Sequence, residues 1–444
     1  MKRFLALLIM LVVTLTNFSA CCGFAEEEKR ELNAAEIFET CVKSTVHIET
    51  SSGGGTGFFV SENIVATNNH VIAEAGWMTV KNADGQVYNV TAVLAHSENP
   101  DLALLEIDGT GECVRVSSSE VREGEALYCI GAPMGIYPCI SDGIVMKRNH
   151  NDRDVDYILS NFHSIGGNSG GPVFDAYGEV IGVCVGGYSD GPNSIDLVIN
   201  AKYLNEMDMS EPRDVLTKEE WVAELNKPEE EKYVKASLND AQVGQLVSFG
   251  RYEQDADTAN GPEEILWLVK DRDVDGLTLM SLYCLDVVPY HHEVIDVTWE
   301  TSDVRAFLNG EFYEKAFSID EKNLIADSTV INHDNILHGT PGGNDTVDKV
   351  YLMSLEEAME FYGVVEPVEW FYDHIYAQAT EYTIQKGVWL EIPDSNRCWW
   401  WLRSPGGNPQ NAGEIGSKGY LSFNGGLVTT TERAIRPLIQ VKVK

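Results

Sequence analysis

The sequence GGNSGGP, residues 166–172, surrounds Ser169 with four glycines, an asparagine and a proline. A tight turn would account for this composition, because glycine adopts positive φ angles at little steric cost. A nucleophile loop would account for it as well, since there backbone N–H groups must face the point that the serine oxygen reaches. The heptapeptide alone leaves both interpretations open.

The residues around this heptapeptide form a succession of short β-like segments. From Val42 to about Ile199, apolar and β-branched runs alternate with Gly, Asn, Asp and Ser; examples are STVHIET, GTGFFVS, LALLEI and GVCVGG. Short, closely spaced strands are typical of antiparallel sandwiches and barrels rather than of βαβ units. About a dozen strands would fill two small barrels, so we predict an all-β fold of two six-stranded barrels.

Length and charge limit the class of protein further. A chain of 444 residues favours roughly two or three domains. The composition, with 44% hydrophobic and 23% charged residues, is that of a folded globular protein. The formal net charge of −37 would repel nucleic acid and anionic membrane surfaces. We therefore predict no nucleic-acid partner.

The first 25 residues have the order of an export signal. Lys2 and Arg3 precede an apolar run, residues 4–13, that is too short to span a bilayer comfortably. Cleavage after Ala25 would release the protein, whereas the sequence FSAC resembles a bacterial lipobox that would place a lipid on Cys21. An uncut N-terminal anchor is a third alternative. We predict an exported protein, extracellular or anchored to the outer face of the bacterial cell membrane.

The cysteines do not indicate a disulfide scaffold or a metal site. Nine cysteines are too few to build the fold on disulfides, and no CxxC or Cys/His spacing indicates zinc. Cys129 and Cys184 stand in apolar strand-like runs, so we expect buried free thiols, although export permits disulfides. We predict that the protein uses no metal and no organic cofactor.

Two further residues would complete the groups that acyl transfer needs. That chemistry uses a nucleophile, a base that takes its proton and a group that orients the base. His70 ends the apolar run IVATNNH, and Asp101 precedes the apolar run LALLEI. Taken singly, His70 is more readily explained as an ordinary surface or core histidine, and Asp101 is more readily explained as a turn residue before a strand.

Three segments that follow one another along the chain make the catalytic interpretation stronger than the single residues do. GTGFFVSENIVATNNHVI, PDLALLEI and GGNSGGPVFD together resemble the trypsin-like serine proteases of the chymotrypsin fold, and specifically the bacterial HtrA/Deg-like branch, over about residues 40–203. The resemblance implies a serine endopeptidase that hydrolyses peptide bonds of protein substrates through an acyl-enzyme. It implies that Ser169 is the nucleophile, His70 the general base and Asp101 the group that orients the imidazole. The N–H groups of Gly167 and Ser169 would form the oxyanion hole.

The segment before the serine, NFHSI (residues 161–165), departs from the family pattern. We expect Phe162 and His163 to reshape the primary specificity pocket. The opposite wall would favour small or medium uncharged side chains at the cleavage point, because its residues are apolar or small. These wall residues are Val183, Cys184, Val185 and Gly186. Nothing in the chain resembles the PDZ domain that HtrA proteases usually carry.

The remainder of the chain has a different character. After a protease-like domain of residues 26–203, residues 204–237 are rich in charge and carry the helix-start signal TKEE, so we predict a charged linker with a short helix. Residues 238–444 would form a separate α+β domain. Landmarks such as GRYEQD, CWWWLRSPGG and RAIRPLI resemble a domain of unknown function from secreted proteins of Gram-positive bacteria, with a weaker similarity to C-type-lectin-like folds.

The C-terminal domain contains two groups of candidate binding residues. The three tryptophans at 399–401 and the nearby Arg403 could form a stacking platform for a sugar or peptide. We favour indoles that fill the core and an Arg403 that pairs with a buried acid. Four histidines lack metal-ligand spacing and are predicted at the surface: His291, His292, His333 and His338. The alternative function is a catalytically inactive surface binding protein, whose C-terminal domain recognises a wall polymer or partner protein.

Overall fold

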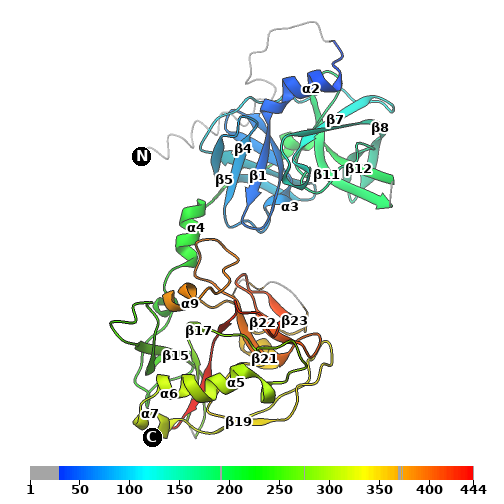
Figure 1. The fold of residues 1–444 in the computed structure, drawn as a ribbon. Helices are drawn as coiled ribbons and strands as arrows, with labels where there is room; N and C mark the ends of the chain where they lie inside the picture. Colours follow the sequence, from blue (N-terminus) through cyan, green and yellow to red (C-terminus); the bar gives the residue numbers. More distant parts are fainter. Residues whose placement is uncertain (1–29, 191–192, 275, 369–371, 373, 444) are drawn as a thin grey trace, which may run out of the picture. The chain divides into compact units, whose positions relative to one another are not determined.

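The computed structural model describes residues 30–443, with the exception of residues 191–192, 275, 369–371 and 373. The predicted export signal, including Cys21, lies outside the described residues. The chain divides into two compact units, Met1–Trp221 and Val222–Lys444 (Figure 1). Every helix in the described part of the chain falls short of the length or the apolar character that crossing a membrane requires.

Six strands of the first unit close into an antiparallel barrel within the described residues. Their order is β5-β4-β1-β2-β3-β6, and β6 pairs back onto β5. Strand β5 can pair on both sides because irregularities between Val90 and Ala92 and between Val93 and Ala95 bend it. The strands are β1 (Thr45–Thr50), β2 (Gly54–Ser61), β3 (Ile64–Thr67), β4 (Met78–Asn82), β5 (Val87–Glu98) and β6 (Asp101–Ile107).

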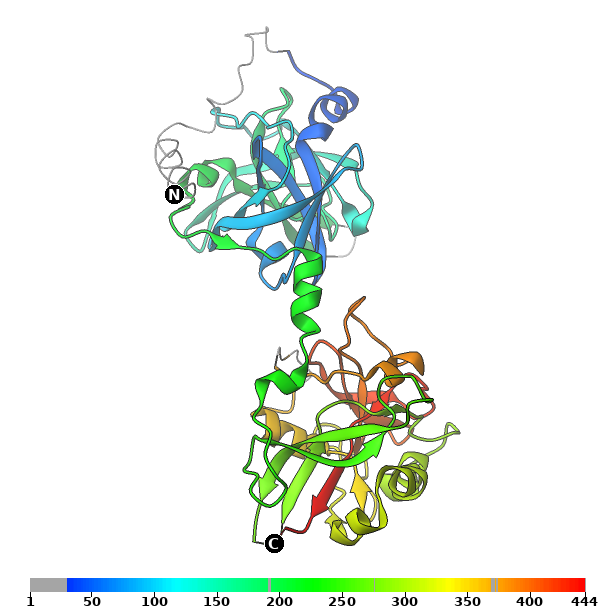
Figure 2. The same ribbon diagram turned by 90° about the vertical axis from the view of Figure 1, so that its left-hand side faces the viewer.

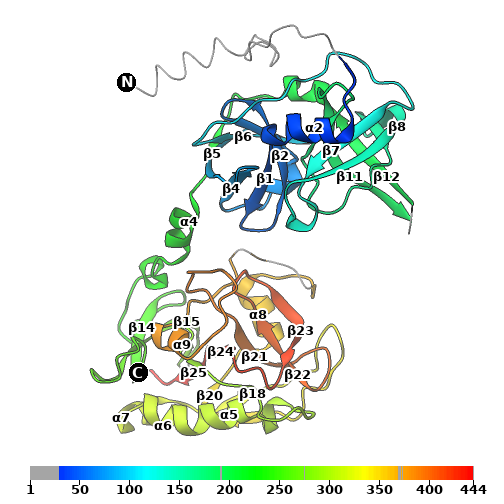
Figure 3. The same ribbon diagram turned by 45° about the horizontal axis from the view of Figure 1, so that its top comes forward.

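A second closed barrel follows in the described part of the same unit, with the strand order β10-β11-β12-β9-β8-β7. The two barrels are visible as the blue and the cyan-to-green strands in Figures 1 and 3. Two closed six-stranded antiparallel barrels fit the chymotrypsin-like fold, so the predicted barrels are confirmed. The strands are β7 (Ala126–Gly131), β8 (Cys139–Asp152), β9 (Val155–Ser160), β10 (Pro172–Phe174), β11 (Val180–Asp190) and β12 (Asn193–Asn200).

A shared hydrophobic core joins the two barrels. Phe58 of β2 and Phe174 of β10 belong to one buried cluster, and helix α2 (Ala34–Cys41) adds Ile37 to it. Burial of these side chains on both sides of the contact fixes one barrel against the other. The loops that leave the two barrels are therefore held next to each other. Short 3₁₀ segments complete this part: η2 (Val42–Ser44), η3 (Pro133–Gly135) and η4 (Ala201–Glu206).

Part of the segment predicted as a linker packs on the first barrel. Strand β13 (Arg213–Asp214) pairs with β5, so this part of the chain belongs to the first unit. Helix α4 (Lys218–Leu225) follows, and the Thr217 hydroxyl accepts a hydrogen bond from the Glu220 amide at 3.2 Å. The predicted helix start is confirmed, and the boundary between the two units falls inside this helix.

The second unit contains two five-stranded sheets and one two-stranded sheet in its described part. The first sheet has the order β14-β15-β16-β25-β20, so β25, drawn in red, lies between green and yellow strands (Figure 2). The second has the order β17-β24-β21-β22-β23, in which β21 and β24 are parallel. The bounds are β14 (Leu246–Tyr252), β15 (Glu263–Arg272), β16 (Leu277–Ser281), β17 (Asp286–Val287), β18 (Ser328–Val330), β19 (Thr346–Asp348), β20 (Val350–Tyr351), β21 (Trp400–Pro405), β22 (Asn411–Ile415), β23 (Leu421–Leu427), β24 (Ala434–Ile435) and β25 (Leu438–Val441).

Short helices connect these strands, and capping side chains define their starts. Ser318 and Ser354 each form a capping box with a glutamate three residues later. The helical segments are η5 (Glu229–Lys232), η6 (Trp299–Thr301), α5 (Asp303–Phe307), the π-helical η7 (Leu308–Phe312), α6 (Tyr313–Ala316), α7 (Ile319–Leu324), α8 (Leu355–Tyr362) and α9 (Glu381–Gln385).

The tryptophan cluster lies in the core of the second unit. Trp400 and Trp401 are 3% and 0% exposed, and Trp399 is 9% exposed. Arg403 is buried as well, and its guanidinium donates to both carboxylate oxygens of Glu357, at 2.6 and 2.8 Å. The core-filling interpretation, with Arg403 paired to an acid, is confirmed. The similarity to C-type-lectin-like folds stays a prediction.

Candidate active site

The three residues predicted for acyl transfer come from strand ends and loops of the two barrels. His70 lies on the short helix α3 (Asn69–Ile72), directly after β3, and Asp101 is the first residue of β6. Because β3 and β6 pair antiparallel, the end of β3 and the start of β6 lie at the same rim of the barrel. Ser169 lies in the loop between β9 and β10 of the second barrel.

His70 and Asp101 form a doubly hydrogen-bonded pair. The Nδ1 atom of His70 lies 2.5 Å from Oδ2 of Asp101, and the backbone N–H of His70 donates to Oδ1 at 2.8 Å. Asn68 holds the same segment, since its side-chain amide donates to the backbone oxygen of Asp101 at 2.8 Å. A carboxylate that accepts from Nδ1–H leaves Nε2 of the imidazole as the proton acceptor. The pair thus sets the tautomer that a general base needs.

The serine loop is bonded to the first barrel beside this pair. The amide of Thr56 donates to the backbone oxygen of Ser169 at 2.8 Å. Gly170 has φ +82°, and a Cβ there would lie 2.1 Å from Oγ1 of Thr67 and 3.0 Å from the amide of Asn68. Only glycine allows this close approach, because a side chain would displace the loop. The backbone after Ser169 therefore packs directly on the segment that carries His70.

Gly167 adopts a conformation that suits an oxyanion site. Its φ is +104°, and a Cβ there would lie 2.2 Å from the backbone oxygen of Ala132. The backbone oxygen of Gly166 accepts from the amide of Met134 at 2.7 Å. Since the peptide is planar and trans, the N–H of Gly167 points to the opposite side of that peptide. Within the described residues, the amides of Gly167 and Ser169 donate no hydrogen bond to another group.

No hydrogen bond joins His70 to Ser169 within the described residues. Catalytic hydrogen bonds are often long or poorly aligned without substrate and tighten in the complex. The His70 side chain is 50% exposed, so the ring has an accessible face. The structure places His70 in contact with Asp101. It also places the loop that carries Ser169 against the same rim of the first barrel.

Thr56 is a positioning residue that sequence reasoning missed. Its hydroxyl donates to the backbone oxygen of Gly167 at 2.7 Å and accepts from the amide of Ala132 at 3.0 Å. Thr56 is fully buried, so water cannot easily replace either bond. A sequence signal existed, because Thr56 stands between two glycines in the segment GTGFFVS.

The structure corrects part of the predicted specificity pocket. Phe162, Val183 and Cys184 are at most 1% exposed, and they fill the hydrophobic cores of the first unit. Their side chains therefore do not line a surface pocket. His163 is exposed, and Val185 and Gly186 are half-buried. Cys129 and Cys184 are buried free thiols, as predicted.

A buried carboxylate, Asp196 of β12, holds the segment before the serine. It is fully buried, and its Oδ2 accepts from the amide of His163 at 2.9 Å. Its Oδ1 accepts from the amide and the hydroxyl of Ser164, at 2.8 and 2.6 Å. His163 takes a positive φ of 56°, which these contacts stabilise. The signal for Asp196 is an acid within the otherwise apolar run IDLVI.

The predicted surface histidines of the second unit are only partly confirmed. His292, His333 and His338 are exposed, as expected. The prediction for His291 is wrong, since this residue is only 7% exposed. The backbone amide of His291 donates to the oxygen of Val428 at 2.9 Å, which holds the histidine against the second sheet of that unit.

A paired imidazole and carboxylate on one antiparallel barrel, and a glycine-flanked serine in a loop of the second barrel that contacts the first, are the residue types that a serine-type protease uses. Residues 55–183 match the family model described as a trypsin-like peptidase domain, and this range contains all three residues. Residues 274–443 match a model described only as a domain of unknown function, DUF6273. The first match supports a serine-type protease, and the second confirms a C-terminal domain of unknown function.

Curated relatives agree with the first match. Serine protease HTRA1 of Xenopus laevis is 30% identical over 171 residues, which are 34% of this chain and 37% of the relative. A probable periplasmic serine endoprotease, DegP-like, of Ectopseudomonas mendocina is 36% identical over 135 residues, which are 29% of this chain and 28% of the relative. The solved serine endoprotease from Yersinia pestis aligns with a TM-score of 0.36 and 20% identity, over 40% of this chain and 65% of that chain. The sequence matches support an HtrA-like serine protease.

Proposed function

We propose that the protein is an exported serine endopeptidase that cleaves peptide bonds of protein substrates through an acyl-enzyme on Ser169. The observation that carries the proposal is the arrangement at one barrel rim. There Asp101 holds His70 through two hydrogen bonds, and Thr56 ties the serine loop to the same barrel.

The geometry supports the following sequence of steps. Nε2 of His70 takes the proton of the Ser169 hydroxyl as its oxygen bonds to the substrate carbonyl carbon. The electron pair of the carbonyl moves to its oxygen, where the amides of Gly167 and Ser169 stabilise the charge. The tetrahedral intermediate then expels the amine, which takes the proton from the imidazolium. Water hydrolyses the resulting ester with the same base, and Asp101 stabilises the imidazolium in both halves.

The remaining pocket residues support a preference for small or medium uncharged side chains at the cleavage point. Val185 and Gly186 contribute apolar or small surface, and no atom of the described residues lies within 4 Å of a Cβ at Gly186. Both oxygens of Asp196 are occupied by donors of the chain itself, so this carboxylate does not offer a free anion to lysine or arginine. Matched peptides with valine or arginine before the scissile bond test this, and faster cleavage after arginine would contradict it.

A fluorophosphonate probe tests the enzymatic proposal without knowledge of the substrate. We expect the folded protein to be labelled, Ser169→Ala to be spared, and Ser119→Ala, a change at an exposed serine outside the site, to be labelled like the unmodified protein. Absence of labelling in folded protein would instead favour the inactive surface binding protein.

Export is supported by the signal-like first 25 residues and by relatives that are named as periplasmic. Mass spectrometry of the mature N-terminus distinguishes the alternatives. A lipidated Cys21 indicates an anchored protein, a start at residue 26 indicates release, and an intact Met1 in exported protein indicates an uncut anchor. A protein retained inside the cell would contradict the proposal.

A further inference from the structure

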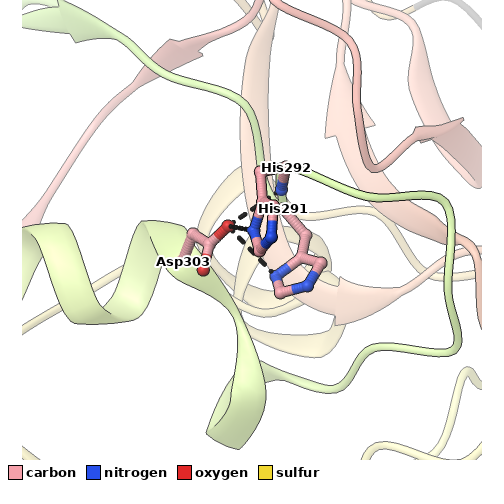
Figure 4. A group of neighbouring side chains, drawn as sticks. All are labelled: His291, His292 and Asp303. Atoms are coloured by element: carbon pink, nitrogen blue, oxygen red, sulfur yellow. Dashed lines mark hydrogen bonds and ion pairs between the residues drawn. The ribbon is translucent and has the colours of Figure 1, made fainter.

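Three potential metal ligands meet in the second unit, whose function the protease chemistry does not explain. His291 and His292 lie on the segment between β17 and η6, and Asp303 is the first residue of α5. One ligand atom from each residue lies within 4.8 Å of the other two. Figure 4 shows both imidazoles next to the carboxylate of Asp303.

One of these side chains is buried, and one of its ring nitrogens has no hydrogen-bond partner among the described residues. The His291 side chain is 9% exposed, and its Nδ1 makes no hydrogen bond with any described residue. The same Nδ1 lies 3.3 Å from Oδ2 of Asp303, toward which it is turned in Figure 4. Buried polar atoms in folded proteins are almost always satisfied, so an orphaned ring nitrogen calls for a partner.

The other contacts hold the cluster in place but leave this nitrogen unexplained. Nδ1 of His292 lies 2.5 Å from Oδ2 of Asp303, and the amide of His292 donates to the same oxygen at 2.8 Å. These bonds tie the loop to the start of α5. These bonds pair Nδ1 and the amide of His292 with the carboxylate of Asp303, which is all that an ordinary ion pair between the two residues requires. His291 is the residue that distinguishes a ligand cluster from a surface ion pair.

The distances and the donor types fit a divalent transition metal. In a tetrahedral zinc site with bonds of about 2.0–2.1 Å, neighbouring ligand atoms lie about 3.3 Å apart. The separation between His291 Nδ1 and Asp303 Oδ2 already has this value, 3.3 Å. The His292 contact would have to open by about 0.8 Å when a metal replaces the shared proton. The His292 side chain is 66% exposed and free to make this movement.

We propose that His291, His292 and Asp303 bind a divalent first-row transition-metal ion of the Zn²⁺ type. Two imidazole nitrogens and one carboxylate suit such ions, whereas Ca²⁺ and Mg²⁺ prefer oxygen ligands. Three protein ligands leave a fourth position for water or for an acceptor group of a bound partner. The ion would also fasten the loop to α5. This site departs from the expectation, drawn from sequence spacing, that the protein binds no metal.

Zinc titration of the full chain tests the proposal. The protein carries Ser169→Ala to prevent self-cleavage, has no polyhistidine tag, and competes for Zn²⁺ with a chromophoric chelator. We expect about one high-affinity ion per chain. His291→Ala, His292→Ala and Asp303→Asn should each weaken binding by about tenfold or more, since even outer-shell changes reach that size. The matched controls are His333→Ala, an exposed histidine, and Asp255→Asn, in an acidic cluster elsewhere in the unit; both should bind as the parent does.

Cobalt provides a second readout that depends on geometry. Co²⁺ in the parent protein should give the intense visible absorption of a four- or five-coordinate ion, and His292→Ala should lose it. Because His292 is exposed, its replacement leaves no cavity, so His292→Ala keeps the test valid even if His291→Ala unfolds. No binding by the parent, or binding that survives both His292→Ala and Asp303→Asn unchanged, would overturn the proposal.

Discussion

Replacing Gly167 by alanine tests whether the backbone of the serine loop creates the oxyanion site. Gly167 has φ +104°, a conformation that L side chains rarely adopt, and holding alanine there costs about 1–3 kcal/mol. The new Cβ would also lie 2.2 Å from the backbone oxygen of Ala132. Relaxed carbon–oxygen contacts begin at about 3.3 Å, so the two groups must separate by about 1 Å.

A displacement of this size is large for catalysis and modest for stability. Oxyanion donors act within about 2.7–3.1 Å of the developing charge, and loss of one donor costs about 10²–10³ in rate. We therefore expect Gly167→Ala to lower the rate of labelling by a fluorophosphonate about 100-fold or more. The free energy of unfolding should fall by only about 1–3 kcal/mol, because the strain is local.

Gly166→Ala is the matched control, one residue earlier in the same loop. A Cβ at Gly166 meets no atom of the described part of the chain within 4 Å, and no positive φ constrains this residue. Labelling of Gly166→Ala should stay within about threefold of the unmodified rate, a change of less than 1 kcal/mol. Both rates are measured as second-order constants on protein whose fold is checked by circular dichroism. Unimpaired labelling of folded Gly167→Ala, or an equal loss in Gly166→Ala, would refute the reasoning.

Three further changes probe other contacts. Asp101→Asn keeps the shape of the pair but removes the acceptor that fixes the His70 tautomer, so peptide hydrolysis should fall by about 10⁴-fold in steady-state assays. Thr56→Val leaves the buried amide of Ala132 and the partly buried oxygen of Gly167 unpaired, so it should lower the urea-derived free energy of unfolding by about 2–4 kcal/mol. An unchanged value would contradict the role of Thr56. Glu357→Gln leaves Arg403 buried without its charge partner and should destabilise the second unit by about 3 kcal/mol in urea titrations. Burial raises the pKa of Glu357, but the hydrogen bonds and the charge of Arg403 outweigh burial and hold that pKa below its ordinary value. The pair therefore contributes its full stability at neutral pH and less as the pH falls through the acidic range, a dependence that Glu357→Gln should lack.

The residue pattern along the chain was enough to predict the barrels and to choose the candidate residues of the site. Strand periodicity and frequent turn residues predict short antiparallel strands, because alternation of side chains across a strand is a local property. The same holds for the glycines around Ser169, because glycine adopts positive φ angles that other residues rarely adopt. His70 and Asp101 could be chosen because their segments resemble those of a known protease class.

The buried groups that hold these residues became visible only in the folded arrangement of the chain. Thr56 and Gly167 are 111 residues apart in the chain, and no local sequence pattern predicts their hydrogen bond. Burial likewise decided that Phe162 fills a core instead of lining a pocket, and that His291 faces Asp303. The physical reason is that burial and partner choice arise when distant segments pack together, whereas backbone preference acts between neighbours in the chain.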